Sequence, residues 1–257
     1  MSKKLKIGII SLTSCEGCQI AILSLGEKLL KLKDKVEFLE FRYLEDQPWP
    51  EHFDVAFIEG SPITKEQLKT LKEARKRADK LIVLGNCAAL GGVHEIKNYK
   101  DKEKIQRYVY KHKKGIANPE IKEIDNFVKV DFTIPGCPIN PEEFLMVLKQ
   151  LIKGEEPKIR QIFVCGECPL QGTKNCFLLQ KKVCFGPWTL GGCGAPCPKN
   201  GLLCLACRGF KKNVNLDVMI KSLSRFVPEK ELKEKLEIFG LRDELFRYEN
   251  NLRTKIN

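Results

Sequence analysis

The sequence predicts an α/β protein: a flavodoxin-like, doubly wound parallel sheet followed by a cysteine-rich, mostly irregular segment and C-terminal helices. Three observations lead to this prediction. Short aliphatic runs alternate with amphipathic stretches over residues 1–155, eight cysteines crowd into residues 165–207, and helical periodicity returns after residue 215. The 257 residues are 43% hydrophobic, which is enough to bury a core in one large or two small domains.

Five short β-branched or aliphatic runs, each ending in a turn signal, are expected to form the strands of the sheet. In chain order they are Leu5–Ser11, Val36–Arg42, Asp54–Gly60, Leu81–Asn86 and Val128–Pro135. Strands with nearly continuous apolar sequence that alternate with helices are typical of a parallel sheet covered on both faces.

Charged amphipathic stretches between the strands predict the helices that cover this sheet. They are Gln19–Leu32, Thr64–Ala78, Lys102–Lys113 and Pro141–Lys153; after the cysteine-rich segment follow Leu216–Arg225, Glu229–Ile238 and Leu241–Leu252. Thr64 and Gln67 have the spacing of a capping box, which marks a helix start. We therefore divide the chain into a flavodoxin-like domain, residues 1–155, and a second domain, residues 156–257.

The charge pattern and the absence of long apolar runs exclude several classes of protein. The net charge is +12, but lysine and glutamate are mixed along most of the chain, and no helix-turn-helix or base-stacking pattern accompanies the charge, so we expect no nucleic-acid binding. No run approaches the roughly 18 to 20 apolar residues of a membrane span, and no signal peptide precedes the first strand. We expect a cytoplasmic protein without membrane insertion, in which the 12 cysteines are metal ligands rather than disulfides.

Four cysteines stand where predicted strands end. Cys15 and Cys18 follow the first strand, Cys87 the fourth and Cys137 the fifth. The carboxyl ends of parallel strands meet at one edge of a sheet, so these thiols are expected to converge on one metal site. A zinc site would also accept four cysteines, and isolated buried cysteines are common.

The other eight cysteines are spaced as two sequential groups of four. These are Cys165-x2-Cys168-x7-Cys176-x7-Cys184 and Cys193-x3-Cys197-x6-Cys204-x2-Cys207. A zinc ribbon uses two Cys-x2-Cys knuckles per ion, whereas each group here has one knuckle within glycine-rich backbone. Proline follows Cys137, Cys168 and Cys197, as in bacterial ferredoxin runs. The spacing favours iron–sulfur clusters; the alternative is a zinc-stabilised basic binding module attracted to acidic partners.

Several motifs in combination resemble the small, electron-transfer subunits of nickel–iron hydrogenases. They are Thr13-Ser14-Cys15-Glu16-Gly17-Cys18-Gln19, Gly85-Asn86-Cys87-Ala88 with Gly91-Gly92, Pro135-Gly136-Cys137-Pro138, and the run from Cys184-Phe185-Gly186-Pro187-Trp188-Thr189 to Gly191-Gly192-Cys193-Gly194. The resemblance covers residues 4 to 210. It implies an oxidoreductase subunit that carries three 4Fe-4S clusters and no catalytic residue of its own.

The resemblance also assigns the cluster ligands. The proximal cluster takes Cys15, Cys18, Cys87 and Cys137; the distal cluster takes Cys165, Cys168, Cys176 and Cys184; the medial cluster takes Cys193, Cys197, Cys204 and Cys207. The division of Cys176 and Cys193 between distal and medial clusters stays open. A cysteine in place of the first distal histidine, and a fourth medial cysteine, are similar to the cytosolic branch and especially to the delta subunits of sulfhydrogenases.

The resemblance implies hetero-oligomeric partners. They are a nickel–iron large subunit, a flavin- and NAD(P)-binding subunit and a ferredoxin-like iron–sulfur subunit, between which this chain would relay electrons. The nearest alternative is a gamma-like subunit of a methanogen viologen-reducing hydrogenase that feeds a disulfide reductase. The related respiratory-complex subunit fits less well, because it has adjacent cysteines and a single cluster. His52, His94 and His112 lack metal-ligand spacing to one another and are expected on the surface or in loops.

Overall fold

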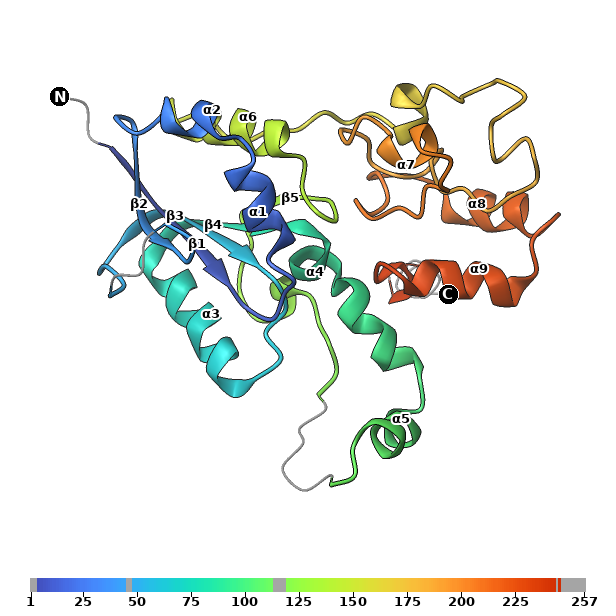
Figure 1. Cartoon of the computed structure of the whole chain (residues 1–257), viewed down its shortest axis with the longest axis horizontal. Helices are drawn as coiled ribbons and strands as arrows, with labels where there is room; N and C mark the ends of the chain where they lie inside the picture. The colour runs from blue at the N-terminus through green and yellow to red at the C-terminus, as the bar shows by residue number, and fades with distance from the viewer. Residues whose placement is uncertain (1–3, 45–47, 113–118, 244, 246–257) are drawn as a thin grey trace, which may run out of the picture.

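In the computed structural model, residues 4–44, 48–112, 119–243 and 245 are described (Figure 1). Within these ranges, five strands form one parallel sheet: β1 (Leu5–Ser11), β2 (Val36–Phe41), β3 (Phe53–Glu59), β4 (Ala78–Leu84) and β5 (Phe132–Ile134). The strand order is β2-β1-β3-β4-β5. This is the flavodoxin-like order, with its switch point between β1 and β3, so the predicted fold class is confirmed.

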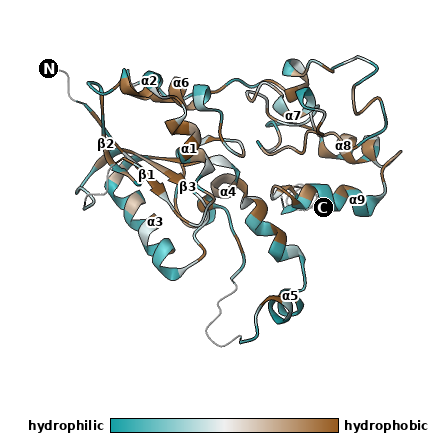
Figure 2. Ribbon diagram, viewed as in Figure 1, coloured by the Kyte–Doolittle hydropathy of each residue, from teal (hydrophilic) through white to brown (hydrophobic). Residues whose placement is uncertain are grey.

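Helices cover both faces of the sheet, as the continuous apolar sequence of the strands predicts. Helices α1 (Gly17–Leu23), α2 (Glu27–Leu30) and α6 (Pro141–Ile152) pack on the face that carries Ile7, Val55 and Ile82. Helices α3 (Lys65–Arg77) and α4 (Gly85–Leu90) pack on the face that carries Ile58 and Val83. Successive strand residues point to opposite faces, so both faces are apolar. Figure 2 shows hydrophobic strands and a hydrophilic outer side of α3.

Several expected element boundaries are wrong, two of them because of a single glycine each. The expected helix over residues 19–32 is broken at Gly26, which has φ 50° and separates α1 from α2. The fourth strand begins and ends earlier than expected, since Gly85, with φ 79°, turns the chain directly into α4. The fifth strand pairs over Phe132–Ile134 rather than over residues 128–135, and it pairs with β4 alone. The capping box is confirmed, because Thr64 Oγ1 accepts the Gln67 N–H at 3.2 Å.

The connection from β4 to β5 holds helical turns, of which the sequence predicted one. Two 3-10 turns, η1 (Gly92–Tyr99) and η2 (Ile124–Asn126), were not predicted. Helix α5 (Lys102–Val109) is shorter than the expected 102–113, and residue 113 lies outside the described ranges. Helix α5 projects away from the sheet at one end of the molecule (Figure 1).

The cysteine-rich part is mostly irregular, as predicted, and is packed on two C-terminal helices. Its regular pieces are η3 (Val164–Glu167) and α7 (Pro196–Lys199). A third apolar core joins its loops to α8 (Leu216–Leu223) and α9 (Glu229–Glu237). Of the helix expected over 241–252, residues 241–243 and 245 are helical, and the others lie outside the described part of the chain. No helix in the described ranges has the length and apolar character needed to cross a membrane.

Candidate iron–sulfur sites

The sheet topology brings the first four cysteines to one edge of the sheet. Cys15 and Cys18 follow β1 next to the switch point, Cys87 lies in α4 directly after β4, and Cys137 follows β5. Burial, with the neighbouring Cys137 and Cys15, raises the pKa of the Cys87 thiol to about 12. Cys18 in turn lies near Cys87, so the four predicted proximal ligands are neighbours.

Glycines leave the space that these thiols occupy. A Cβ atom at Gly85 would lie 2.5 Å from Cys18 Sγ, and a Cβ atom at Gly92 would lie 3.0 Å from Cys87 Sγ. Both glycines also have positive φ, a conformation that L side chains rarely adopt. The Gly85 and Gly92 positions of the sequence motifs are thus required by the packing around the sulfur atoms.

Glu59 is a buried carboxylate at this edge that the sequence analysis did not single out. It ends β3, is 2% exposed, and its Oε1 accepts the backbone N–H of Cys18 at 2.9 Å. Burial and then the Glu59 charge raise the pKa of the Cys18 thiol. An acidic residue at the carboxyl end of a mainly apolar, buried strand was the signal that could have identified it.

A second group consists of Cys165, Cys168, Cys176 and Cys184. Burial raises the pKa of Cys165 to about 11, with further contributions from the other three thiols. The backbone N–H groups of Gly186 and Cys204 donate to Cys184 Sγ. A Cβ atom at Gly186 would lie 3.2 Å from Cys165 Sγ, so a glycine again makes room for sulfur.

A third group, Cys193, Cys197, Cys204 and Cys207, lines a cavity of about 630 Å³ that also reaches Cys137. The N–H of Ala195 donates to Cys193 Sγ, and the N–H of Ala206 donates to Cys204 Sγ. Cys204 lies between this group and the second one: its neighbours include both Cys184 and Cys207. The structure thus places Cys176 in the second group and Cys193 in the third.

The first and third groups are directly connected through Cys207. The backbone N–H of Cys137 donates to Cys207 Sγ. The side-chain amide of Asn86 donates to the Cys207 carbonyl oxygen at 3.0 Å and to the Phe239 carbonyl oxygen at 3.2 Å. The three groups therefore form a continuous series from the sheet edge into the cysteine-rich part.

The buried Arg208 strengthens this connection, and the sequence analysis missed it. Its guanidinium donates to the carbonyl oxygens of Pro135, Leu190 and Gly191 at 2.8 to 3.1 Å. It also donates to both carboxylate oxygens of Glu143. An arginine directly after a Cys-x2-Cys knuckle, in an apolar setting, was the available signal.

The spacing of the sulfur atoms bears on the kind of metal group that fits. All twelve cysteines are described, and all are free thiols. No three of these cysteines bring their sulfur atoms within 4.8 Å of one another. A tetrahedral zinc ion, with Zn–S bonds of about 2.3 Å, holds its sulfurs about 3.8 Å apart. The thiols are therefore spaced more widely than the ligands of a zinc ion.

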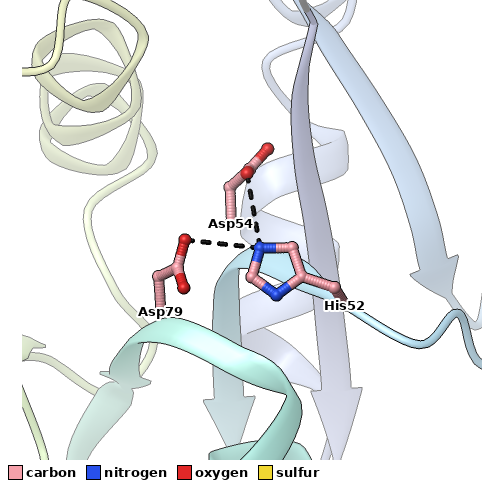
Figure 3. Close-up of side chains that lie close together, drawn as sticks. All are labelled: His52, Asp54 and Asp79. Carbon is pink, nitrogen blue, oxygen red and sulfur yellow. Dashed lines mark ion pairs between the residues drawn. The ribbon is translucent and has the colours of Figure 1, made fainter.

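A His-Asp-Asp group lies at the opposite, amino edge of the sheet (Figure 3). His52 Nε2 is 3.6 Å from Asp54 Oδ1 and 3.3 Å from Asp79 Oδ2. The His52 and Asp79 side chains are largely exposed. This is the arrangement of a surface ion-pair cluster, and the expected surface position of His52 is confirmed.

Comparisons with known proteins agree with this geometry. Residues 15–151 match the sequence family described as NADH ubiquinone oxidoreductase, 20 Kd subunit. The delta subunit of sulfhydrogenase 2 from Pyrococcus furiosus is 38% identical over 240 residues, which cover 92% of this chain and 99% of that subunit. The chain belongs to the family of nickel–iron hydrogenase small subunits. It is accordingly an electron-transfer subunit of a hydrogenase complex.

Other hydrogenase subunits are also similar to much of the chain. A relative from the F420-non-reducing hydrogenase vhu of Methanocaldococcus jannaschii is 34% identical, and the match covers 83% of this chain and 84% of that relative. A crystal structure of an NAD+-reducing [NiFe]-hydrogenase in the H2-reduced state contains a similar chain with a TM-score of 0.56 and 28% identity. That match covers 62% of this chain and 96% of the hydrogenase chain.

Proposed function

We propose that this subunit relays electrons through three 4Fe-4S clusters between the nickel–iron site of a large subunit and a flavin, NAD(P) or iron–sulfur partner. The observation that carries the proposal is the series of three cysteine groups: Cys137 lines the cavity of the third group, and Cys204 lines the cavities of both the second and the third group. Bound clusters would supply one-electron transfer, and the chain supplies the ligands, their order and a largely apolar surrounding.

The proposed ligand sets follow the three groups. Cys15, Cys18, Cys87 and Cys137 hold the proximal cluster in residues 1–155; Cys193, Cys197, Cys204 and Cys207 hold the medial cluster, and Cys165, Cys168, Cys176 and Cys184 the distal cluster, in residues 156–257. The neighbours of Cys176 and of Cys207 support this division. The proximal set lies nearest the large subunit in this arrangement.

Two features of the structure favour iron–sulfur clusters over zinc. The sulfur atoms are spread more widely than a zinc ion allows. Backbone N–H groups point at the sulfurs of Cys18, Cys184, Cys193, Cys204 and Cys207. Such hydrogen bonds stabilise thiolates and tune the potential of a cluster.

The names of the relatives bear on the electron acceptor. A further relative, the delta subunit of the NAD-reducing hydrogenase HoxS from Cupriavidus necator, is 30% identical over 59% of this chain and 80% of that subunit. Together with the sulfhydrogenase relative, it supports a cytoplasmic complex that passes electrons to NAD(P) through a flavin subunit. The vhu relative supports the second candidate, a methanogen-type complex that feeds a disulfide reductase.

Anaerobic purification of the complex, followed by analysis of iron, sulfide and zinc, tests the proposal. Three 4Fe-4S clusters predict about 12 iron atoms and about 12 sulfides per chain, with reducible paramagnetic signals. About two or three zinc ions without sulfide would overturn the iron–sulfur assignment.

A further inference from the structure

The net charge of the chain is concentrated around the proposed medial and distal clusters. Residues 157–216 contain nine lysines and arginines and a single acidic residue, Glu167, so this segment carries most of the net charge of +12. Arg208 is buried against Glu143. The other eight cations are Lys158, Arg160, Lys174, Lys181, Lys182, Lys199, Lys211 and Lys212; seven of them are exposed and Lys211 is half-buried.

The single carboxylate of the segment does not neutralise this charge. Glu167 Oε2 instead accepts the backbone N–H groups of Gly192 and Gly194 at 2.8 and 3.0 Å. Within the described ranges, none of the eight cations forms an ion pair with a carboxylate. In the sheet domain, positive and negative side chains are mixed, whereas these eight cations create a positive electrostatic potential. A positive potential attracts acidic partners and raises their association rates.

One loop places three of these cations beside the proposed distal ligands. Residues 173–182 fold back on themselves: the Gln180 N–H donates to the Cys176 carbonyl oxygen, and the Gln180 side chain donates to the Lys174 carbonyl oxygen. The Lys182 Nζ lies 5.5 Å from the centre of the Phe177 ring. Phe177 lines the cavity that also contains Cys165 and Cys176.

The same loop has the composition of a docking surface. Leu179 is 64% exposed and follows Phe177 and Leu178 in the loop. Lys174, Lys181 and Lys182 therefore flank an exposed apolar residue in the sequence of the loop, which also carries or adjoins partly exposed thiols. Apolar contact within a charged rim is the usual anatomy of a protein interface.

We propose that the loop 173–182 docks an acidic iron–sulfur electron carrier, whose carboxylates face Lys174, Lys181 and Lys182. The inference rests on the proposed function, since the docked carrier would accept one electron at a time from the distal end of the chain. The apolar contact at Leu179 would bring the carrier against the Cys165 group, and the lysine charges would orient it.

The test uses the anaerobic complex of this chain with its large subunit, with dihydrogen as reductant and an acidic plant-type [2Fe-2S] ferredoxin as the probe. The variant Lys174→Glu/Lys181→Glu/Lys182→Glu is compared with Lys31→Glu/Lys33→Glu/Lys35→Glu. The second variant is the control. It changes the net charge by the same amount, at exposed positions just after α2 in the sheet domain. Benzyl viologen reduction, which needs no protein docking, reports on cluster loading in every sample.

We expect the loop variant to lower the second-order rate of ferredoxin reduction at low salt by about tenfold or more, and to weaken its dependence on ionic strength. The control should change the rate by less than about threefold, and neither variant should lose viologen reduction. Ferredoxin reduction that responds equally to both variants, or to neither, overturns the docking site. A wild-type complex without iron–sulfur signals overturns the proposed function instead, so the two failures are distinguishable.

Discussion

Arg208 and Glu143 form a buried ion pair in which Arg208 Nη2 donates to both carboxylate oxygens, each at 2.9 Å, and the side chains are 1% and 6% exposed. Glu143 belongs to α6 on the sheet, whereas Arg208 directly follows Cys207 in the cysteine-rich part. Burial of Glu143 works to raise its pKa, and the Arg208 charge works to lower it. The pair is therefore a fully buried charged connection between the two parts of the chain.

Replacing Arg208 by methionine should weaken this connection severely. The substitution leaves the Glu143 charge and the Pro135 carbonyl oxygen buried without their donor, and loss of one partner of a buried pair costs about 3–5 kcal/mol. Loss of cluster absorbance on anaerobic heating should begin at a clearly lower temperature in Arg208→Met than in the wild type.

Two controls separate the buried charge from other effects of the Arg208 substitution. Arg107→Met breaks a pair with Glu103 that is largely exposed, and should cost less than about 1 kcal/mol. Arg208→Met/Glu143→Met removes both charges and should recover part of the loss. Equal losses in Arg107→Met and Arg208→Met would contradict the interpretation.

Glu59→Gln should raise the reduction potential of the proposed proximal cluster. Glutamine keeps an oxygen that can accept the Cys18 N–H, but it removes a buried negative charge whose effect extends to Cys18, Cys87 and Cys137. Without that charge, addition of an electron becomes more favourable. A redox titration followed by electron paramagnetic resonance measures the change, with the exposed Glu231→Gln as control. An unchanged or lower reduction potential of the proximal cluster in Glu59→Gln would show that the Glu59 charge does not act on this cluster.

Much of the fold could be predicted from the sequence because its signals are local. The apolar run Leu5–Ser11 is β1 to the residue, and Thr64 with Gln67 marks the start of α3. The cysteines could be assigned to the sheet edge, since each follows a strand and parallel strands end at one edge. These inferences need no knowledge of which distant segments touch.

What the sequence could not show depends on long-range contacts. Arg208 meets Glu143 across 65 positions, and Glu59 meets Cys18 across 41 positions. The break at Gly26 and the early end of β4 depend on positive φ at single glycines, which a helical or apolar pattern does not reveal. Sequence periodicity predicts elements well and the polar contacts between them poorly.

A buried carboxyl group gives the protein a predictable pH dependence. Glu95 in η1 is 1% exposed and interacts with Asp243, while the Tyr99 hydroxyl donates to Asp243 at 3.0 Å. Burial first, and then the charge of Asp243, raises the pKa of Glu95 to about 9, with a smaller contribution from Glu123. The folded protein thus keeps a proton on Glu95 that the unfolded chain releases near pH ~4.3.

The sign of the effect follows from the proton count. Between about pH 4.5 and 9 the folded state binds one more proton at this site than the unfolded state, so stability falls as the pH rises. Glu95→Gln, which cannot lose a proton, should show a smaller decrease in melting temperature from pH 5 to pH 9 than the wild type. The exposed Glu231→Gln should keep the wild-type slope. Parallel pH profiles for Glu95→Gln and wild type would show that Glu95 is ionised in the fold.

The ligand assignment predicts different losses for Cys18→Ser and Cys165→Ser in the assembled complex. Cys18 belongs to the group at the sheet edge and Cys165 to the group farthest along the series. Cys18→Ser should abolish the proximal signal and all transfer of electrons to external acceptors, since every electron passes that end.

Cys165→Ser should leave dihydrogen-driven reduction of the proximal and medial clusters intact. Turnover with the physiological acceptor should fall, because a serine ligand shifts the potential of the distal cluster or destroys the cluster. Isotope exchange at the nickel–iron site needs no external electrons and should persist in both variants if the complex assembles. Loss of the proximal signal in Cys165→Ser would show that the order of the clusters is wrong.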